Sequence, residues 1–301
     1  MLTLTVGAER AGERLDALLQ GLDVPALGPL SQRRARALCE LHAVAIDGVV
    51  AAGSTRLRQG QRVTFAAGHA ARTLQLRIPV EYEADDVLVL WKPPGLAVHK
   101  GPLVDHSVAD ALAKACPGAG LAQRIDRDAS GLLLVGLTTS SLQRLGAAME
   151  HGGIDRHYLA VVAGVVAEDQ QTIDLPLRVT DEPRGDQPKT IVDAAGQRAV
   201  SHVTVVDRRK DASLVRVQLE TGRTHQIRAH LRAIGHPLLG DARYGDPQAN
   251  ARARSTFGVD RTLLHGTRLC FPAVIAGDTV EVVAAHPTDF ARLFPRLAAR
   301  A

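Results

Sequence analysis

One aspartate, Asp126, lies between arginines in the segment Gln123-Arg-Ile-Asp-Arg-Asp-Ala-Ser-Gly-Leu132. Ser130 and Gly131 predict a turn, and the continuous apolar run at residues 132–137 predicts a buried strand. Loops held by a rigid scaffold often carry catalytic groups, so this pattern favours an active carboxylate just before the strand. The same pattern also suits an aspartate that only forms a salt bridge within a turn.

A second segment favours the active carboxylate over the salt-bridged turn residue. Residues 219–241 combine a glycine turn, a helical run rich in Arg and His, and a closing Gly-His-Pro loop. Two such segments in one chain are hard to attribute to chance. Together they predict a site that is assembled from distant parts of the sequence.

These two segments, with three others, resemble the pseudouridine synthases of the large-subunit ribosomal RNA and transfer RNA type. The signature of that family reads His-Arg-Leu-Asp-x-x-Thr-Ser-Gly-Leu. The other matching segments are residues 87–99, 156–164 and 264–289, and all the matches lie within roughly residues 80–295. The chain has Gln123, Ala129 and Arg156 where the family commonly has His, Thr and Lys. These departures remove no reactive group, so they affect the expected geometry and rate more than the reaction type.

The resemblance implies that the protein isomerises uridine to pseudouridine within RNA. In that reaction the C1′–N1 bond is broken, the freed uracil turns, and C5 is joined to C1′. Because no atom is gained or lost, no cofactor and no metal is expected. The family's essential aspartate corresponds to Asp126, and the sequence leaves open whether it attacks covalently or removes a proton.

The resemblance also suggests roles for three other residues. Arg228 corresponds to the arginine beside the aspartate, where a permanent cation favours an ionised carboxylate that burial would otherwise neutralise. Tyr158 corresponds to a tyrosine that packs against the target base, although its sequence context alone predicts a core residue of a strand. Arg124 is expected to replace the extruded nucleotide or to hold its phosphate.

Positive charge is uneven along a chain whose net charge is only +4. Residues 31–72 contain seven Arg and two acidic residues, and residues 221–254 contain six Arg and two Asp. A genome that prefers Arg to Lys would explain the choice of Arg but not this clustering, which predicts an RNA phosphate-binding surface. The candidate RNA-binding residues are Arg33, Arg34, Arg36, Arg124, Arg223, His225 and Gln226.

The first part of the chain has the outline of a small RNA-binding module. Residues 13–19 and 31–41 predict helices, the second with a Ser31 cap, and Asp47-Gly48 predicts a hairpin before a strand at residues 61–65. This order is similar to the S4 RNA-binding module. We therefore expect an S4-like domain at residues 1–67 and a catalytic domain at residues 78–301, with the boundary in the small-residue stretch 66–72.

Short apolar strands dominate the second part, with helices expected at residues 140–149 and 224–234. This pattern and the resemblance predict an α+β fold with a mixed, largely antiparallel central sheet. Residues 180–198, rich in Pro, Gly and charge, predict a loop or an irregular hairpin.

Other chemistries fit the sequence less well. His225 and His230 are five residues apart and would point about 140° from each other on a helix, which disfavours a metal site. A Ser130–His225–Asp126 triad lacks the Gly-x-Ser-x-Gly pattern of hydrolases. Three well-separated cysteines indicate neither a disulfide framework nor a zinc site.

The first residues do not read as a signal peptide, and no apolar run reaches the roughly 18 residues of a membrane span. We therefore expect a cytoplasmic protein, without a membrane partner, that acts as a monomer on RNA, with ribosomal RNA favoured and transfer RNA possible. The alternative is a non-catalytic RNA-binding factor for ribosome assembly that keeps the same fold. The combination of Asp126, Tyr158 and Arg228 favours the enzyme, because a protein that only binds has no chemical need for all three.

Overall fold

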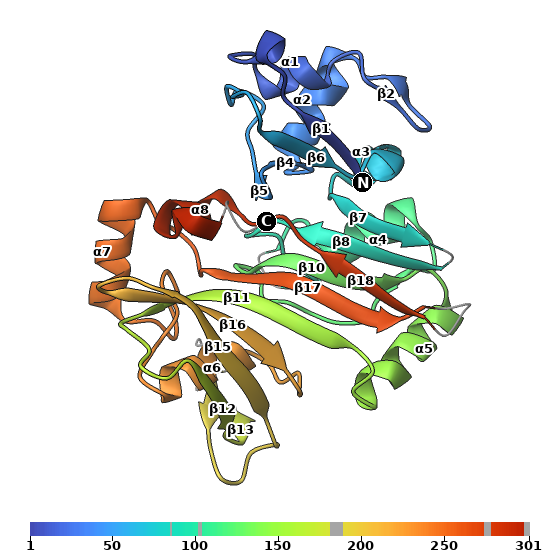
Figure 1. Cartoon of the computed structure of the whole chain (residues 1–301). Helices are drawn as coiled ribbons and strands as arrows, with labels where there is room; N and C mark the ends of the chain where they lie inside the picture. Colours follow the sequence, from blue (N-terminus) through green and yellow to red (C-terminus); the bar gives the residue numbers. More distant parts are fainter. Residues whose placement is uncertain (85, 102–103, 181–188, 274–277, 298–301) are drawn as a thin grey trace.

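The computed structural model describes residues 1–84, 86–101, 104–180, 189–273 and 278–297. The first part of the chain forms a small module above the large sheet (Figure 1). Its strands pair antiparallel in the order β1-β6-β4-β5, and two helices pack beside them. The elements are β1 (Leu2–Thr5), η1 (Ala8–Arg10), α1 (Leu15–Leu19), β2 (Asp23–Val24), β3 (Gly28–Pro29), α2 (Gln32–Glu40), β4 (Val44–Ile46), β5 (Val49–Val50) and β6 (Arg62–Phe65).

Local sequence signals in this module are reflected in the structure. The Ser31 side chain accepts a hydrogen bond from the backbone N–H of Arg34 and caps α2 as predicted. Asp47 and Gly48 have φ angles of 49° and 74°, as a tight hairpin turn between β4 and β5 requires. The helix expected at residues 13–19 is confirmed but begins later, at Leu15.

The stretch expected to separate the two domains is helical. It forms η2 (Ala67–His69) and α3 (Ala70–Leu76). Ala70 belongs to the core of the N-terminal module, whereas Leu76 belongs to the core beneath the large sheet. A helix with one end in each core connects the two parts more firmly than a loose linker would.

The large sheet has ten strands in the described part of the chain, in the order β12-β15-β16-β11-β17-β10-β8-β7, with β18 beside β17 and β9 beside β10. Every pair is antiparallel except β10 with β17, so the prediction of a mixed, largely antiparallel sheet is confirmed. The strands are β7 (Val80–Ala84), β8 (Val87–Lys92), β9 (Gly120–Leu121), β10 (Ser130–Gly136), β11 (Asp155–Ala163), β12 (Gln170–Asp174), β15 (Val200–Arg208), β16 (Ala212–Leu219), β17 (Leu264–Pro272) and β18 (Thr279–Val283).

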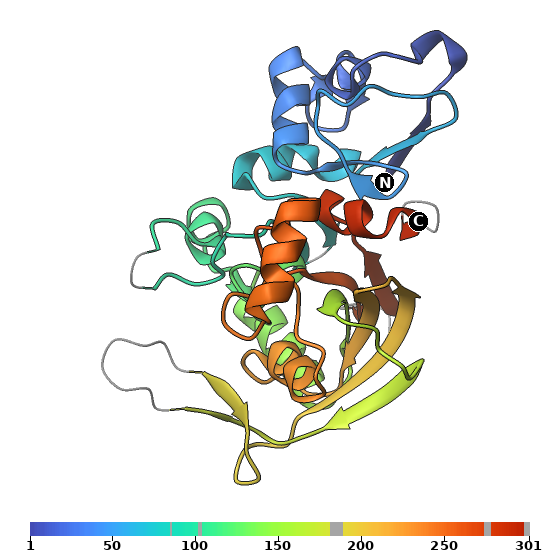
Figure 2. The same cartoon turned by 90° about the vertical axis from the view of Figure 1, so that its left-hand side faces the viewer.

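Helices and a hairpin surround this sheet, as the two views show (Figures 1 and 2). The helices are α4 (Val108–Ala115), α5 (Thr139–Glu150), α6 (Gln226–Ala233), α7 (Pro247–Phe257), α8 (Thr288–Leu293) and η3 (Pro295–Leu297). The hairpin pairs β13 (Leu177–Val179) with β14 (Thr190–Val192) and confirms the irregular hairpin predicted in this region. The centre of the predicted region, residues 181–188, lies outside the described residues.

The turn expected at Ser130 and Gly131 is wrong, because both residues already belong to β10 and the turn lies at Arg127 and Asp128. Gly131 has a φ of 115°, and a β-carbon there would lie 2.2 Å from the backbone oxygen of Gly266 in β17. The glycine therefore serves a close approach of two strands rather than a chain reversal.

The N-terminal module docks on the sheet through backbone hydrogen bonds as well as apolar contacts. The N–H of Val50 donates to His286 O at 2.9 Å, and the N–H of His286 donates to Gly48 O at 2.8 Å. Val50 is also part of the apolar cluster that contains Trp91. We refer to this contact between the module and the sheet as the module junction.

Candidate active site

Asp126 lies in the loop between β9 and β10, with its side chain 23% exposed. Lys92 at the end of β8 supports this loop from beneath. Its buried ammonium group donates to the backbone oxygens of Pro93, Leu96 and Arg127 at 2.8, 2.9 and 2.9 Å. Burial lowers the pKa of Lys92 to about 7, with a smaller contribution from the charge of Arg261. The sequence analysis did not single out Lys92, although it lies in the matching segment 87–99.

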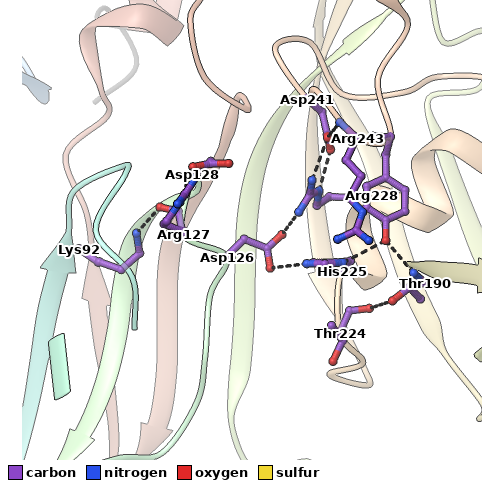
Figure 3. Close-up of polar contacts among 11 residues, drawn as sticks. Lys92, Asp126, Arg127, Asp128, Thr190, Thr224, His225, Arg228, Asp241 and Arg243 are labelled. Atoms are coloured by element: carbon purple, nitrogen blue, oxygen red, sulfur yellow. Dashed lines mark hydrogen bonds and ion pairs between the residues drawn. The ribbon is translucent and has the colours of Figure 1, made fainter. Parts of the chain in front are cut away.

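Arg228 connects Asp126 to a buried second carboxylate. Its Nη1 lies 3.0 Å from Asp126 Oδ2, while its Nε and Nη2 lie 2.7 and 2.8 Å from the two oxygens of Asp241 (Figure 3). The bidentate contact with Asp241 fixes the plane of the guanidinium and leaves one edge for Asp126. Sequence reasoning paired Arg228 with Asp126 but missed Asp241, which ends the segment 219–241.

The charges in this group support each other. Burial lowers the pKa of Arg228, but the hydrogen bonds and charges of Asp241 and Asp126 outweigh it and raise that pKa above its ordinary value. Burial likewise raises the pKa of Asp241, but its contacts with Arg228 and with backbone N–H groups keep that pKa below its ordinary value. Arg228 and Asp241 therefore both stay ionised in a site that excludes most water.

His225 faces the other oxygen of Asp126. Its Nε2 lies 3.9 Å from Asp126 Oδ1, and its Nδ1 lies 3.0 Å from the hydroxyl oxygen of Tyr244. Burial lowers the pKa of His225 below its ordinary value, so the imidazole is neutral at pH 7. His225 has a left-handed backbone with a φ of 52°, which is why α6 begins at Gln226 and not at the expected Thr224.

Tyr158 in β11 is buried, and its pKa is raised by burial, so the phenol keeps its proton. It pairs with Gly266 of β17, where a β-carbon would lie 3.5 Å from the Tyr158 ring. That distance is ordinary van der Waals contact, so the ring packs directly against β17. Tyr158 and Asp126 both line a cleft of about 850 Å³.

The candidate RNA-binding residues fall into three groups. Arg124, Arg223 and His225 line the cleft with Asp126, and the two arginines are exposed. Arg33, Arg34 and Arg36 are exposed on α2 of the N-terminal module and do not line this cleft.

Gln226 differs from its prediction as an RNA-binding residue. Its side chain is 2% exposed, and its amide forms hydrogen bonds within the protein. Its Nε2 donates to Val200 O and Ser201 Oγ, and its Oε1 accepts from Thr221 and from the N–H of Arg223. Gln226 therefore holds the turn before α6 against β15 and has no polar group left for RNA.

The positions that depart from the family signature lie around the loop of Asp126. Gln123 donates to Leu132 O at 3.3 Å, and its Oε1 is buried without a hydrogen-bond partner. Ala129 is 1% exposed, and Arg156 is buried at the cleft wall with its Nε unpaired. The loop is thus held by Lys92 and by backbone contacts, without the threonine hydroxyl that the family commonly has.

The rival sites considered from sequence are not assembled. The Ser130 hydroxyl is buried and lies 2.9 Å from His265 Nδ1, not beside His225, so no Ser130–His225–Asp126 triad exists. His230 is buried and contacts Ser201 Oγ and Leu175 O.

Within the described ranges, no cluster of three or more His, Cys, Asp or Glu is arranged to hold a metal ion. The described helices also include none that is long and apolar enough to cross a membrane.

Comparison with known proteins agrees with this geometry. Residues 86–233 match the family described as RNA pseudouridylate synthase. The chain is 31% identical to RNA pseudouridine synthase YlyB of Bacillus subtilis over 98% of both chains. It is 33% identical to ribosomal large subunit pseudouridine synthase D of Vibrio vulnificus, over 97% of this chain and 93% of that protein.

A solved structure shares the fold. Human RNA pseudouridylate synthase domain containing 4 superposes with a TM-score of 0.61 at 22% identity, over 76% of this chain and 96% of that one. The family match and these relatives define an RNA-modifying isomerase, which here has a mixed, largely antiparallel sheet. The chain belongs to the RNA pseudouridylate synthase family, and its reaction is the isomerisation of uridine in RNA.

Proposed function

We propose that Asp126 is the reacting carboxylate of this synthase. The observation that carries the proposal is the unequal environment of its two oxygens. Oδ2 accepts a hydrogen bond from Arg228 at 3.0 Å, whereas His225 Nε2 faces Oδ1 at 3.9 Å, beyond hydrogen-bond distance. Arg228 therefore fixes Oδ2, and Oδ1 is the oxygen left for the substrate at the cleft.

This arrangement serves either role of the aspartate. A nucleophile needs a free oxygen that can reach C1′ of the uridine, and a base needs a free oxygen that can reach a proton on the ribose. In both cases the carboxylate must be ionised before the substrate binds. Arg228, fixed by Asp241 from behind, places a permanent positive charge beside Oδ2 without occupying the reactive oxygen.

We infer that Tyr158 packs against the target uracil and takes part in removing the C5 proton. Its ring lines the same cleft as Asp126, and its phenol is protonated because burial raises its pKa. The hydroxyl can therefore donate a hydrogen bond to the base, and its oxygen can take up the C5 proton as its own proton passes to solvent in the cleft.

The RNA must give up the stacking of one nucleotide before C1′ can reach Asp126, at a cost of about a few kcal/mol. We propose that Arg124 and Arg223 at the cleft offset this cost by binding phosphates or filling the vacated position. Arg33, Arg34 and Arg36 would add phosphate contacts from residues 1–67, acting as an S4-like module next to a catalytic domain at residues 78–301.

Ribosomal RNA is the proposed substrate, because several relatives that match most of this chain carry the name ribosomal large subunit pseudouridine synthase D. We further propose that the enzyme acts as a monomer in the cytoplasm, where such RNA is modified, and that it needs neither cofactor nor metal.

Release of tritium from RNA labelled at C5 of uridine tests this proposal, because forming the C5–C1′ bond expels that hydrogen. Purified protein is mixed separately with ribosomal and transfer RNA from cells that have no pseudouridine at the positions concerned. We expect release from ribosomal RNA and background counts from transfer RNA. Release from transfer RNA alone would contradict the substrate, and no release from either, free or within ribosomal particles, would contradict the function.

A further inference from the structure

Tyr244 contacts both groups that face Asp126. The Cζ of Arg228 lies 4.7 Å from the centroid of the Tyr244 ring, and the Tyr244 hydroxyl lies 3.0 Å from His225 Nδ1. Tyr244 is 1% exposed, so packing fixes its position. The apolar cluster around it consists of Leu177, Ala199 and Ala229. Sequence reasoning gave this tyrosine no role.

The hydrogen bonds of the Tyr244 hydroxyl have a defined direction. The backbone N–H of Thr190 donates to the hydroxyl oxygen at 2.8 Å, which uses one of its lone pairs. The hydroxyl proton then needs an acceptor, and His225 Nδ1 is in place at 3.0 Å. A neutral imidazole whose Nδ1 accepts must carry its proton on Nε2.

The local backbone aims the His225 ring at Asp126. The left-handed conformation of His225 is uncommon for a residue other than glycine, and such residues cluster at functional sites. The residue before it is also held, because the Thr190 hydroxyl donates to Thr224 O at 2.9 Å. β14 therefore fixes both the backbone that leads into His225 and the hydroxyl that contacts its ring.

We propose that Tyr244 and His225 are positioning residues for Asp126: Tyr244 fixes the Nε2–H form of His225, and this N–H faces Oδ1 while Arg228 holds Oδ2. The inference deepens the proposed function, since it rests on Asp126 being the reacting group. At 3.9 Å the N–H orients the carboxylate electrostatically without occupying the lone pairs of Oδ1. The opposite tautomer would turn a nitrogen lone pair toward that oxygen and repel it.

Tyr244→Phe separates the contact of the ring with Arg228 from the contact of the hydroxyl with His225. It keeps the ring beneath Arg228 and the apolar packing, but it removes the hydroxyl that fixes the His225 tautomer. We expect kcat to fall about tenfold, with little change in KM, because the reacting oxygen is less well oriented. The acidic limb of the pH profile should also shift, since the hydroxyl no longer favours the neutral ring. Tyr82→Phe, away from the cleft, is the matched control and should leave both unchanged.

Nitrogen-15 NMR of the His225 imidazole reads the tautomer directly and needs no RNA. At a pH where the ring is neutral, the native protein should show the proton on Nε2, and Tyr244→Phe should show a mixture of the two forms. A native protein with the proton on Nδ1 would overturn the inference, whatever its activity. Correct tautomers in a protein that converts no RNA would instead count against the proposed function alone.

A double-mutant cycle distinguishes positioning from a merely structural effect. His225→Gln places an amide N–H near the position of Nε2 and has no tautomer to fix. In that background, Tyr244→Phe should cost no further activity if the hydroxyl acts through His225. A loss of about tenfold in both backgrounds would overturn the inference, because Tyr244 would then act by another route.

Discussion

Ionisable side chains are buried in two regions of this protein, and the two regions treat them in opposite ways. In the cleft, Arg228 and Asp241 are 9% and 0% exposed, yet each has a charged partner at hydrogen-bond distance. At the module junction, Glu81 of β7 and His286 line a pocket together with residues of the N-terminal module. Burial raises the pKa of Glu81 to about 7 and lowers the pKa of His286 to about 4. The Nδ1 of His286 is buried there without a hydrogen-bond partner.

The difference shows what each region requires. A charge that is buried with a partner stays ionised, and the cleft uses this to keep a carboxylate ready for the substrate. An ionisable group that is buried without a charged partner is neutralised. The contact at the junction is therefore formed by neutral groups, and its strength depends on pH. Substitutions in the cleft should therefore change turnover, with or without a change in stability, whereas substitutions at the junction should change stability alone.

The largest effect is expected from Arg228→Gln. The substitution removes the cation from both Asp126 and Asp241, so we expect kcat to fall by about 10³-fold. Tritium release under single-turnover conditions measures this loss, and circular dichroism checks the fold. Arg232→Gln on the same helix is the matched control, because Arg232 is exposed. If the two variants had equal activity, the paired charge of Arg228 would matter no more to turnover than the exposed charge of Arg232.

Tyr158→Phe should have the next largest effect. The ring remains in place against the base, but the hydroxyl can no longer donate or pass on a proton, so kcat should fall by about 10²-fold. RNA affinity, measured by filter binding, should stay near that of the native protein. Unchanged turnover would exclude a role for the hydroxyl.

Asp241→Asn should act on stability and activity together. It leaves Arg228 buried with one anionic partner, which should cost about 3 kcal/mol in the free energy of unfolding measured by urea. Turnover should fall about tenfold, because the guanidinium loses the contact that orients it toward Asp126. Asp260→Asn, at an exposed position, should change neither quantity. A stable Asp241→Asn enzyme with full activity would contradict the account of the cleft.

Glu81→Gln should change stability alone. The folded pKa of Glu81, about 7, lies above its unfolded value of 4.5, so its contribution to stability is lost as the pH rises between these values. The free energy of unfolding of the variant should therefore be about 2 kcal/mol higher than that of the native protein at pH 8 and equal to it at pH 4.5. Urea unfolding at both pH values measures this difference. A difference that does not depend on pH would show that the carboxyl is not neutralised at the junction.

His286→Gln is the converse test at the same junction and should have the smallest effect near neutral pH. The folded pKa of His286, about 4, lies below the ordinary 6.5, so its contribution is present above pH 6.5 and is lost as the pH falls toward 4. The free energy of unfolding of the variant should equal that of the native protein at pH 7.5 and should be higher than that of the native protein at pH 5. Equal unfolding profiles at pH 5 would contradict burial of a neutral ring.

The sequence predicts the parts of the site that carry chemistry better than the parts that support it. Asp126, Tyr158 and Arg228 lie in recognisable segments. The structure places Asp126 and Tyr158 on the cleft and Arg228 behind Asp126, at 3.0 Å. Asp241 and Tyr244 acquire their roles from contacts with Arg228 and His225 across the fold, which no local pattern encodes.

The incorrect predictions have the same cause. Gly131 has the appearance of a turn residue, yet it is required by the approach of β17, which is distant in the sequence. Gln226 lies in a basic segment that suggests RNA contact, yet β15 takes up its amide. The helical form of residues 67–76 depends on two apolar cores on either side, which the small residues of the predicted boundary at 66–72 do not reveal.

If the Asp126 carboxylate performs the chemistry, it should be needed for turnover but not for RNA binding. The most direct measurement compares native protein and Asp126→Asn on the same ribosomal RNA, recording RNA affinity and single-turnover tritium release together. The account predicts affinity within about threefold and release at background for the variant. Release from the Asp126→Asn protein within about tenfold of the native rate would contradict it.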